Sequence, residues 1–335
     1  MAQENIIKNR LKEAADIDPL QNSTSEELGE LVKEKLTVKG KGAELVIRPK
    51  DKVNRNIWIF NNDILDTMNE NAPIEIDTSR AGSNDKASIM FRAYYGELAE
   101  NDFFGRLEEK LTELNYLNEY DKEVCIAAAS VFYEYGDIMT LSQIHYTMGY
   151  NTKPNPEQLR KLKESLEKMR TLKIMIDNTS EHLAYSNIET FPYNGVVLPW
   201  ESREICVNGQ VTDAVIHLFR EPPLMTLARK RNQITTISRS IQAAPFNKTP
   251  QNNILYDYLI DRITSIQREA NKKTHKNKKA SNRILYETVF EHLQLADAKA
   301  KRRVKEKIED YLKHFKKEKL IKNYKKDDEG VSIIL

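Results

Sequence analysis

Two helical segments with regularly spaced apolar residues, one in the middle of the chain and one near its end, constrain the fold most. In the segment over 155–173, Asn155 is a favourable N-cap and Pro156 a favourable first helical residue. Its apolar residues recur at intervals of three and four: Leu159, Leu162, Leu166 and Met169. The segment over 297–315 repeats this spacing with Val304, Ile308, Tyr311, Leu312 and Phe315. Both segments are therefore predicted to be amphipathic helices that bury one face.

Two further helical patterns precede the first of these helices, and two short apolar segments follow it. The preceding patterns cover 103–136 and the stretch from a Thr140 cap to Gly149. The following segments, 173–177 and 183–188, flank a polar turn and are predicted to form a β-hairpin. Three helices followed by a hairpin are the element order of a winged helix.

The same order returns near the C-terminus. Helical patterns over 252–270 and 280–295 precede the helix over 297–315. The closing segment, 320–335, contains two apolar-rich strands around the turn sequence "DDEG". We therefore predict an α+β protein, mostly α, with two winged-helix domains in tandem whose wings are short β-hairpins.

The predicted domains cover 101–208 and 251–335, with a proline-marked connector over 209–250. Residues 1–100 are less regular. They contain one short amphipathic helical pattern and two apolar segments that are typical of strands. The sequence leaves open whether this N-terminal region is a small domain or a partly flexible arm.

The charge of the chain is nearly balanced overall but unevenly distributed. The formal net charge is +2. From Arg268 to Leu335 there are 20 Lys and Arg residues against 11 Asp and Glu residues, a net charge of +9, so the remainder carries −7. A basic segment of this kind is typical of a surface that binds a phosphate backbone, and a solvated lysine-rich loop is the alternative.

Signatures of other classes of protein are missing from the sequence. No run approaches the roughly 20 apolar residues of a membrane span, and the first residues lack a secretory pattern, so we expect a cytoplasmic protein without membrane contact. Cys125 and Cys206 do not support a disulfide framework or a zinc site. Gly40, Lys41 and Gly42 lack the spacing of a phosphate-binding loop, and the six histidines are scattered. We therefore expect no enzyme activity, no cofactor and no metal.

The helix over 297–315 carries the residues best placed to read DNA. A helical projection puts Lys299, Arg302 and Arg303 on or near the face opposite the apolar stripe, with Lys305 at its flank. Cations in a first helical turn oppose the helix dipole, at a cost of roughly 0.3 to 1 kcal/mol each. That cost makes sense if this helix end enters the major groove, with the arginines on guanine and the lysines on phosphate.

Other cations are predicted to contact the DNA backbone. In the second unit they lie between its first two helices and in its wing: Lys272, Lys273, Lys276, Lys278, Lys279, Arg283, Lys322, Lys325 and Lys326. In the first unit they lie on its third helix, where glutamates dilute them: Arg160, Lys161 and Lys163. The connector adds Arg229, Lys230 and Arg231, which are equally consistent with the end of a capped helix. The wing acids at 327–329 are expected to turn away from the DNA.

Several segments together resemble the replication-initiator-like proteins encoded by plasmids and integrative elements of Gram-positive bacteria. The resemblance is carried by a succession of loose patterns from about residue 100 to the end: 118–150, 155–177, 193–201, 218–237 and 320–335. In outline these proteins are similar to theta-type plasmid initiators, which bind repeats with tandem winged helices. The resemblance implies binding to an origin, local opening of the duplex, and recruitment of host replication proteins such as a helicase or its loader. By position, the helices Pro156–Lys173 and Asp297–Phe315 would read the DNA.

Two alternatives to an initiator stay open on the sequence. A transcriptional or partitioning regulator would use the same two DNA-binding modules for another purpose. A protein-interaction scaffold would use its winged helices to bind a protein, with the lysines only keeping the chain soluble. The expected partner is double-stranded DNA, and a homodimer is a further open alternative.

Overall fold

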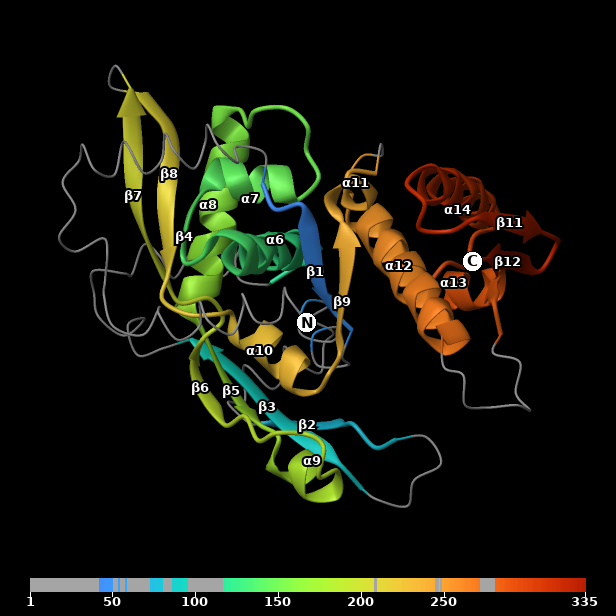
Figure 1. The fold of residues 1–335 in the computed structure, drawn as a ribbon, viewed down its shortest axis with the longest axis horizontal. Coiled ribbons are helices and arrows are strands. Elements are labelled where there is room, and N and C mark those ends of the chain that lie inside the picture. The colour runs from blue at the N-terminus through green and yellow to red at the C-terminus, as the bar shows by residue number, and fades with distance from the viewer. Residues whose placement is uncertain are drawn as a thin grey trace. The chain divides into compact units, whose positions relative to one another are not determined.

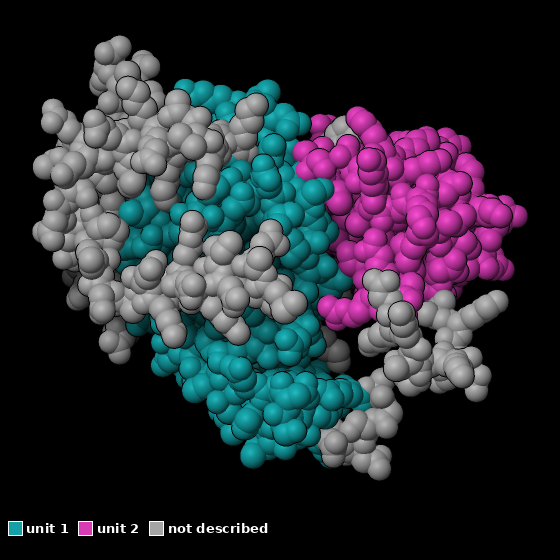
Figure 2. Space-filling view, in the orientation of Figure 1, with its two compact units in different colours: residues 1–239 teal, residues 240–335 magenta. Residues whose placement is uncertain are grey.

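The chain is an α+β protein built from helices and small antiparallel sheets, as a computed structural model shows (Figure 1). The described residues are 42–50, 54, 58, 73–80, 86–95, 117–207, 210–244, 247, 249–271 and 281–335. They divide into two compact units, residues 1–239 and 240–335, which are coloured separately in Figure 2. Each unit is described by itself.

Three consecutive helices form the helical part of the first unit: α6 (Glu119–Tyr135), α7 (Leu141–Thr147) and α8 (Pro156–Thr171). Each begins with a capping box, in which the N-cap side chain and the side chain three residues later satisfy each other's backbone N–H groups. The predicted N-caps Thr140 and Asn155 are confirmed. The helical pattern predicted from residue 103 begins at Glu119 within the described residues, because Asn118 is its cap.

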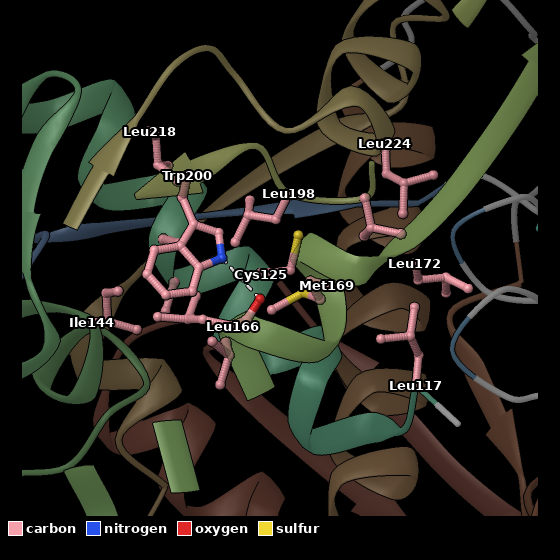
Figure 3. Packing of buried hydrophobic residues seen from close by; sticks show 14 of the residues in the cluster. Leu117, Cys125, Ile144, Leu166, Met169, Leu172, Leu198, Trp200, Leu218 and Leu224 are labelled. Carbon is pink, nitrogen blue, oxygen red and sulfur yellow. Dashed lines mark hydrogen bonds between the residues drawn. The ribbon is translucent and has the colours of Figure 1, made fainter. Parts of the chain in front are cut away.

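The core of the first unit lies between these helices and the strands that follow them. The predicted stripe of α8, from Leu159 to Met169, is buried. Trp200 is also buried and its indole Nε1 donates to the carbonyl of Leu166 at 2.8 Å, which satisfies the only polar atom of that side chain (Figure 3). Cys125 packs in the same core, and burial raises the pKa of its thiol to about 12. This thiol is therefore a packing residue, as predicted.

A three-stranded sheet flanks the helices. It contains β4 (Ile138–Thr140), β7 (Trp200–Val207) and β8 (Gln210–Leu218). The order is β4-β8-β7, so β8 is central and β7 and β8 form an antiparallel hairpin. The second half of this hairpin lies in the predicted connector, and residues 209–239 of that connector belong to the first unit.

The hairpin predicted over 173–188 does not form, and this prediction was wrong. β5 (Leu172–Asp177) is present, but the next segment is a short helix, α9 (Thr179–Ala184). The Asp177 carboxylate accepts from the backbone N–H and the hydroxyl of Thr179 at 2.8 and 2.6 Å, which turns the chain into that helix. β5 instead pairs with two other strands, in the four-stranded order β2-β3-β5-β6.

Two sheets join the N-terminal hundred residues to the rest of the first unit. The four-stranded sheet contains β2 (Ile74–Asp77), β3 (Ser88–Tyr95) and β6 (Tyr193–Val196) together with β5. In a second pairing β1 (Leu45–Pro49) lies beside β9 (Ile234–Ser238), which follows α10 (Pro223–Lys230). The described strands before residue 100 are therefore not a separate arm, because β1 and β3 pair with strands more than 70 residues downstream and β2 pairs with β3.

The second unit begins within a short helix, α11 (Arg239–Gln242), and has a simpler element order. Its elements are α12 (Pro250–Asn271), β10 (Arg283–Leu285), α13 (Tyr286–His292), α14 (Ala298–Lys317), β11 (Asn323–Lys326) and β12 (Gly330–Ile334). The sheet order is β10-β12-β11, and the predicted closing hairpin is confirmed. β12 approaches β10 closely at Gly330. A side chain at this position would meet the Ile284 carbonyl oxygen, 2.3 Å from an ideal Cβ.

The two units share an order of elements. Each has a helix, a short strand, two more helices and a hairpin, and each sheet places the short strand beside the last strand of the hairpin. The first unit differs by the segment β5, α9 and β6, which is inserted between its third helix and its hairpin. The predicted buried stripe of α14, from Val304 to Phe315, is confirmed.

Candidate nucleic-acid interface

The start of α14 follows α13 after a tight turn. Gln294 adopts a left-handed conformation, with φ of 53°, just after α13. Asp297 then caps α14, because its carboxylate accepts from the backbone N–H of Ala300 at 2.7 Å. The turn between the two helices is thus set by local backbone geometry.

Two lysines in the first turns of α14 are occupied by contacts within the second unit. Lys301 lies 3.4 Å from the carboxylate of Glu287 and 5.2 Å from the centre of the Phe290 ring, both on α13. Lys305 lies 4.5 Å from the centre of the Tyr286 ring and donates to the carbonyl of Asp328 at 3.3 Å. These lysines fasten α14 to α13 and to the hairpin turn, so Lys305 is a poorer candidate for DNA contact than its position in the sequence indicated.

The remaining cations of these turns face solvent. Lys299, Arg302 and Arg303 are all exposed. Arg302 has only a loose contact with Glu306, at 3.6 Å with the arginine side chain 80% exposed, and such a pair contributes little. Among the described residues Lys299 and Arg303 have no ion-pair partner. This small cluster is the part of the predicted interface that the structure brings together.

The predicted wing lysines divide between the two faces of the sheet. Lys326 points toward α14, where its ammonium lies 2.7 Å from the carboxylate of Glu309. Lys325 is the neighbouring residue of the same strand and therefore points to the opposite face. Lys322, which precedes β11, is exposed.

Arg283 is occupied by the hairpin turn. Its guanidinium lies 2.5 Å from Asp327 and 3.3 Å from Glu329. The acidic residues of the turn therefore neutralise this arginine, which was predicted to bind DNA. They were expected only to turn away from the DNA. The five loop lysines predicted as backbone contacts lie outside the described residues: Lys272, Lys273, Lys276, Lys278 and Lys279.

The cations of α8 in the first unit are mostly occupied. Arg160 pairs with both Glu157 and Glu164, and its hydrogen bond holds the pKa of Glu157 below its usual value. The ammonium of Lys161 lies 4.3 Å from the centre of the Tyr120 ring. Lys163 is half-buried. The predicted backbone contacts of α8 are therefore engaged in its own unit.

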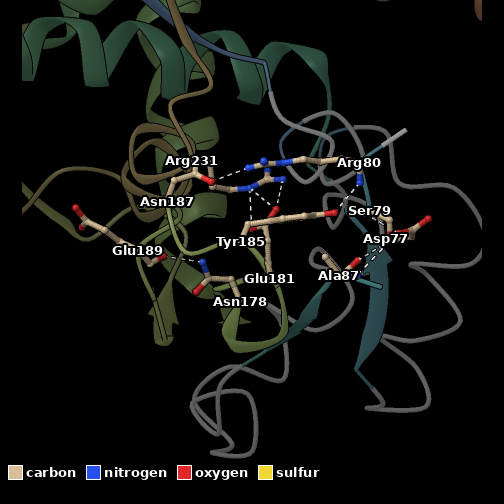
Figure 4. Close-up of polar contacts among 10 residues, drawn as sticks. All are labelled: Asp77, Ser79, Arg80, Ala87, Asn178, Glu181, Tyr185, Asn187, Glu189 and Arg231. Carbon is tan, nitrogen blue, oxygen red and sulfur yellow. Dashed lines mark hydrogen bonds and ion pairs between the residues drawn. The ribbon is translucent and has the colours of Figure 1, made fainter. Parts of the chain in front are cut away.

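The basic cluster at 229–231 is structural. Arg231 is buried, and its guanidinium lies 2.7 Å from the buried carboxylate of Glu181 on α9 (Figure 4). Arg229 pairs with Glu221 at 2.7 Å, and Lys230 pairs with Glu189 at 2.6 Å. Arg231 cannot reach a duplex from this position, so its predicted contact with DNA was wrong.

Apart from Lys326, the residues of a second cationic surface were not among the predicted contacts. The last turns of α14 and β11 enclose an open groove of about 690 Å³ lined by Glu309, Lys313, Lys316, Lys317, Asn323, Tyr324 and Lys326. The sequence contained a signal for it, since Lys313 and Lys317 follow Lys299 and Arg302 at helical spacing. The sequence prediction covered only the N-terminal turns of this helix.

Comparison with known proteins adds no relative. Family models, curated protein sequences and solved structures were all searched, and none of them matches this chain. In the part of the chain that the structure describes, no helix is both long and apolar enough to cross a bilayer. Within those same residues, no three side chains of the histidine, cysteine, aspartate and glutamate types gather as a metal site would require.

Proposed function

We propose that this chain binds double-stranded DNA through the exposed face of α14 in its second unit. The observation that carries the proposal is the cluster of Lys299, Arg302 and Arg303, which are exposed and hardly neutralised. Cations without a carboxylate partner gain most from a phosphate, because binding releases condensed counterions and breaks no ion pair within the protein. The contrast with the paired cations of α8 favours the second unit as the principal DNA reader.

The contacts around α14 support an approach by its N-terminal end. Lys301 and Lys305 tie this end to α13 and to the hairpin turn, so the outward cations sit on a braced helix. In helix-turn-helix proteins the second helix enters the major groove and its first residues contact base edges, while the preceding helix crosses the backbone. On this proposal Arg302 and Arg303 read guanines, and Lys299 and Lys322 bind phosphate.

We further propose that both units are winged-helix domains in tandem. The support is the element order that they share, together with the equivalent sheet orders β4-β8-β7 and β10-β12-β11. The wing of the first unit is then β7 and β8, and the β5-α9-β6 segment is an insertion before it. The wing of the second unit is β11 and β12.

The biological role that we propose is initiation of plasmid or mobile-element replication at an origin with repeats, in the cytoplasm and without catalysis. It follows from the resemblance of the sequence, and it implies a host helicase or its loader as a partner. A transcriptional or partitioning regulator is the second candidate, because two DNA-binding modules serve either purpose equally.

Selection of bound fragments from random-sequence and host-element DNA tests this proposal. We expect enrichment of a short motif that recurs as direct repeats, and affinity that falls steeply with salt, by about 0.9 in logarithmic slope for each phosphate neutralised. Absence of binding to any duplex at low salt would overturn the proposal and favour a protein-interaction scaffold. A plasmid that still replicates without this gene would overturn the initiator role and leave the regulator.

A further inference from the structure

The groove at the C-terminal end of α14 differs from the proposed DNA-binding face in shape. Its walls are the last turns of α14 and the strand β11, and its volume is about 690 Å³. Cavities of roughly 300 to 1,000 Å³ hold small ligands or short segments of chain. A DNA duplex is too wide to enter such a groove and would touch only its rim.

Strand β11 offers backbone groups along this groove that have no strand partner among the described residues. It is the outermost strand of the order β10-β12-β11, so within that part of the chain only one of its edges is bonded. Asp327 donates its N–H to the carbonyl of Gly330. In an antiparallel pair, every second residue of a strand bonds to the neighbouring strand, and the residues between them point their N–H and C=O groups the other way. Asn323 and Lys325 therefore bond to β12, while Tyr324 and Lys326 direct their N–H and C=O groups to the free edge.

The charge of the groove is strongly positive. It is lined by four lysines and one carboxylate, Glu309. Lys313 and Lys326 share that carboxylate, at 3.6 and 2.7 Å, and the hydrogen bond from Lys326 lowers the pKa of Glu309. Lys316 donates to the neutral amide of Asn323 at 3.1 Å. Among the described residues neither Lys316 nor Lys317 has a carboxylate partner.

We propose that this groove binds an acidic segment of a partner protein as an added β-strand. Main-chain hydrogen bonds to Tyr324 and Lys326 would hold the segment in register, and its alternate carboxylates would meet Lys316 and Lys317. The added strand would extend the sheet of the second unit by one member beside β11.

Lysines on an edge strand commonly prevent unwanted strand pairing, and this property sets the specificity of the groove. An apolar strand would have to bury the two uncompensated ammonium groups, and a basic strand would be repelled by them. An acidic strand supplies the carboxylates that Lys316 and Lys317 lack. The lysines therefore select the partner instead of excluding every partner.

The inference does not rest on DNA binding. Arg303 and Lys316 are separated by about 20 Å along the helix axis, so the two surfaces can be altered one at a time. A variant can therefore lose peptide binding and keep DNA binding, or lose DNA binding and keep peptide binding, and both outcomes can be measured.

The test uses the full chain and a fluorescent peptide of alternating glutamate and valine, about six residues long. Fluorescence anisotropy measures its affinity for the native chain and for the double variant K316Q/K317Q, which loses two charges at the groove. We expect the variant to bind the peptide roughly fivefold more weakly or worse, and to bind duplex DNA as before. The matched control K299Q/R303Q loses two charges at the other end of the same helix and should bind the peptide normally.

A second peptide separates strand addition from simple charge attraction. It carries the same side chains, but the amide nitrogens on one edge are methylated, so that it cannot bond to β11. We expect it to bind at least roughly tenfold more weakly. Equal binding of both peptides, or equal loss in both double variants, would overturn the inference. Displacement of the peptide by a short duplex from the native chain would also overturn it and assign the groove to DNA.

Discussion

Helices α8 and α14 hold the same place in the element orders of their units, but their cations are in opposite states. Both helices bury one apolar stripe and carry several cations outside it. On α8 Arg160 pairs with two glutamates, whereas on α14 Lys299 and Arg303 face solvent and have no carboxylate partner within the described part of the chain. The charge that a helix can offer to a polyanion depends on which cations are unpaired, and the number of cations alone does not determine it.

The same contrast extends to the rest of each unit. In the first unit the cations at 229–231 join α10 and its flanking residues to three carboxylates. Among the described residues of the second unit, comparable contacts near the proposed interface are made by Arg283, Lys326 and the two inward lysines of α14. Cations therefore mainly stabilise the first unit and are mainly displayed by the second.

The largest expected effect is the loss of stability when a buried cation of the first unit is removed. Arg231→Ala should lower the free energy of unfolding of that unit by about 3 to 5 kcal/mol, because the buried carboxylate of Glu181 loses its partner. Urea unfolding followed by circular dichroism measures the change.

Lys230→Ala is the matched control, since this lysine is the neighbouring residue and its partner Glu189 is 72% exposed. Its loss should cost no more than about 1 kcal/mol. Similar small losses in both variants would show that the buried pair does not stabilise the unit.

The second-largest expected effect is on the affinity for DNA. Arg303→Ala should weaken binding to the selected sequence roughly 5- to 150-fold, the range expected for an arginine that reads a base. The corresponding change in the other helix, Arg160→Ala, should alter affinity by less than about twofold, because that guanidinium is held by Glu157 and Glu164.

Titration of both variants with specific and random duplexes distinguishes their roles. A loss from Arg303→Ala that is identical on every sequence would reassign this residue to phosphate contact. A larger loss from Arg160→Ala than from Arg303→Ala would reverse the assignment of the two units.

Removal of the helix caps is expected to have a smaller effect, a similar loss of stability in the two units. Asn155→Ala and Asp297→Ala should each destabilise the helix that they begin by about 1 kcal/mol. Asp297 also places a carboxylate beside the cations of α14, so Asp297→Ala should not weaken DNA binding at concentrations where the unit stays folded. A marked loss of affinity in this variant would show that the cap orients α14 for binding.

The sequence predicted the helices of both units because their signals are local. Asn155, Gln158 and the stripe from Leu159 to Met169 act within a few turns of chain, and the structure shows the expected cap and burial. The closing hairpin was equally local, since the turn residue Asp327 accepts from the N–H groups of Glu329 and Gly330 at 3.0 Å.

The pairing of strands in the first unit could not be predicted in this way. β5 has the alternating burial of a strand, but nothing near it in the sequence indicates that its partner is β3, about 80 residues earlier. The segment after it looked like a second strand and is a helix because Asp177 turns the chain. Contacts between segments distant in the sequence therefore set the strand pairing here, and the local pattern of residues does not determine it.

The candidate site was also predictable only where its signals are local. The exposed positions of α14 follow from its periodicity, so Lys299, Arg302 and Arg303 were found from the sequence. The partners that occupy other cations come from distant segments: Arg231 meets Glu181 and Arg283 meets Asp327. A charge pattern cannot reveal such pairs, which is why the predicted interface was larger than the one that the structure supports.

The smallest expected effect comes from releasing the cations of α8 instead of removing those of α14. In the double variant E157Q/E164Q, Arg160 loses both of its carboxylate partners and becomes available to an approaching phosphate. If α8 lies against the duplex when the chain binds two repeats, affinity for repeat DNA should rise by about twofold and the salt dependence should steepen. Affinity for a single repeat, which the second unit can bind alone, should stay constant. An unchanged affinity for both DNAs would mean that α8 does not face the duplex, and the similarity of the two helices would then be one of architecture without a shared function.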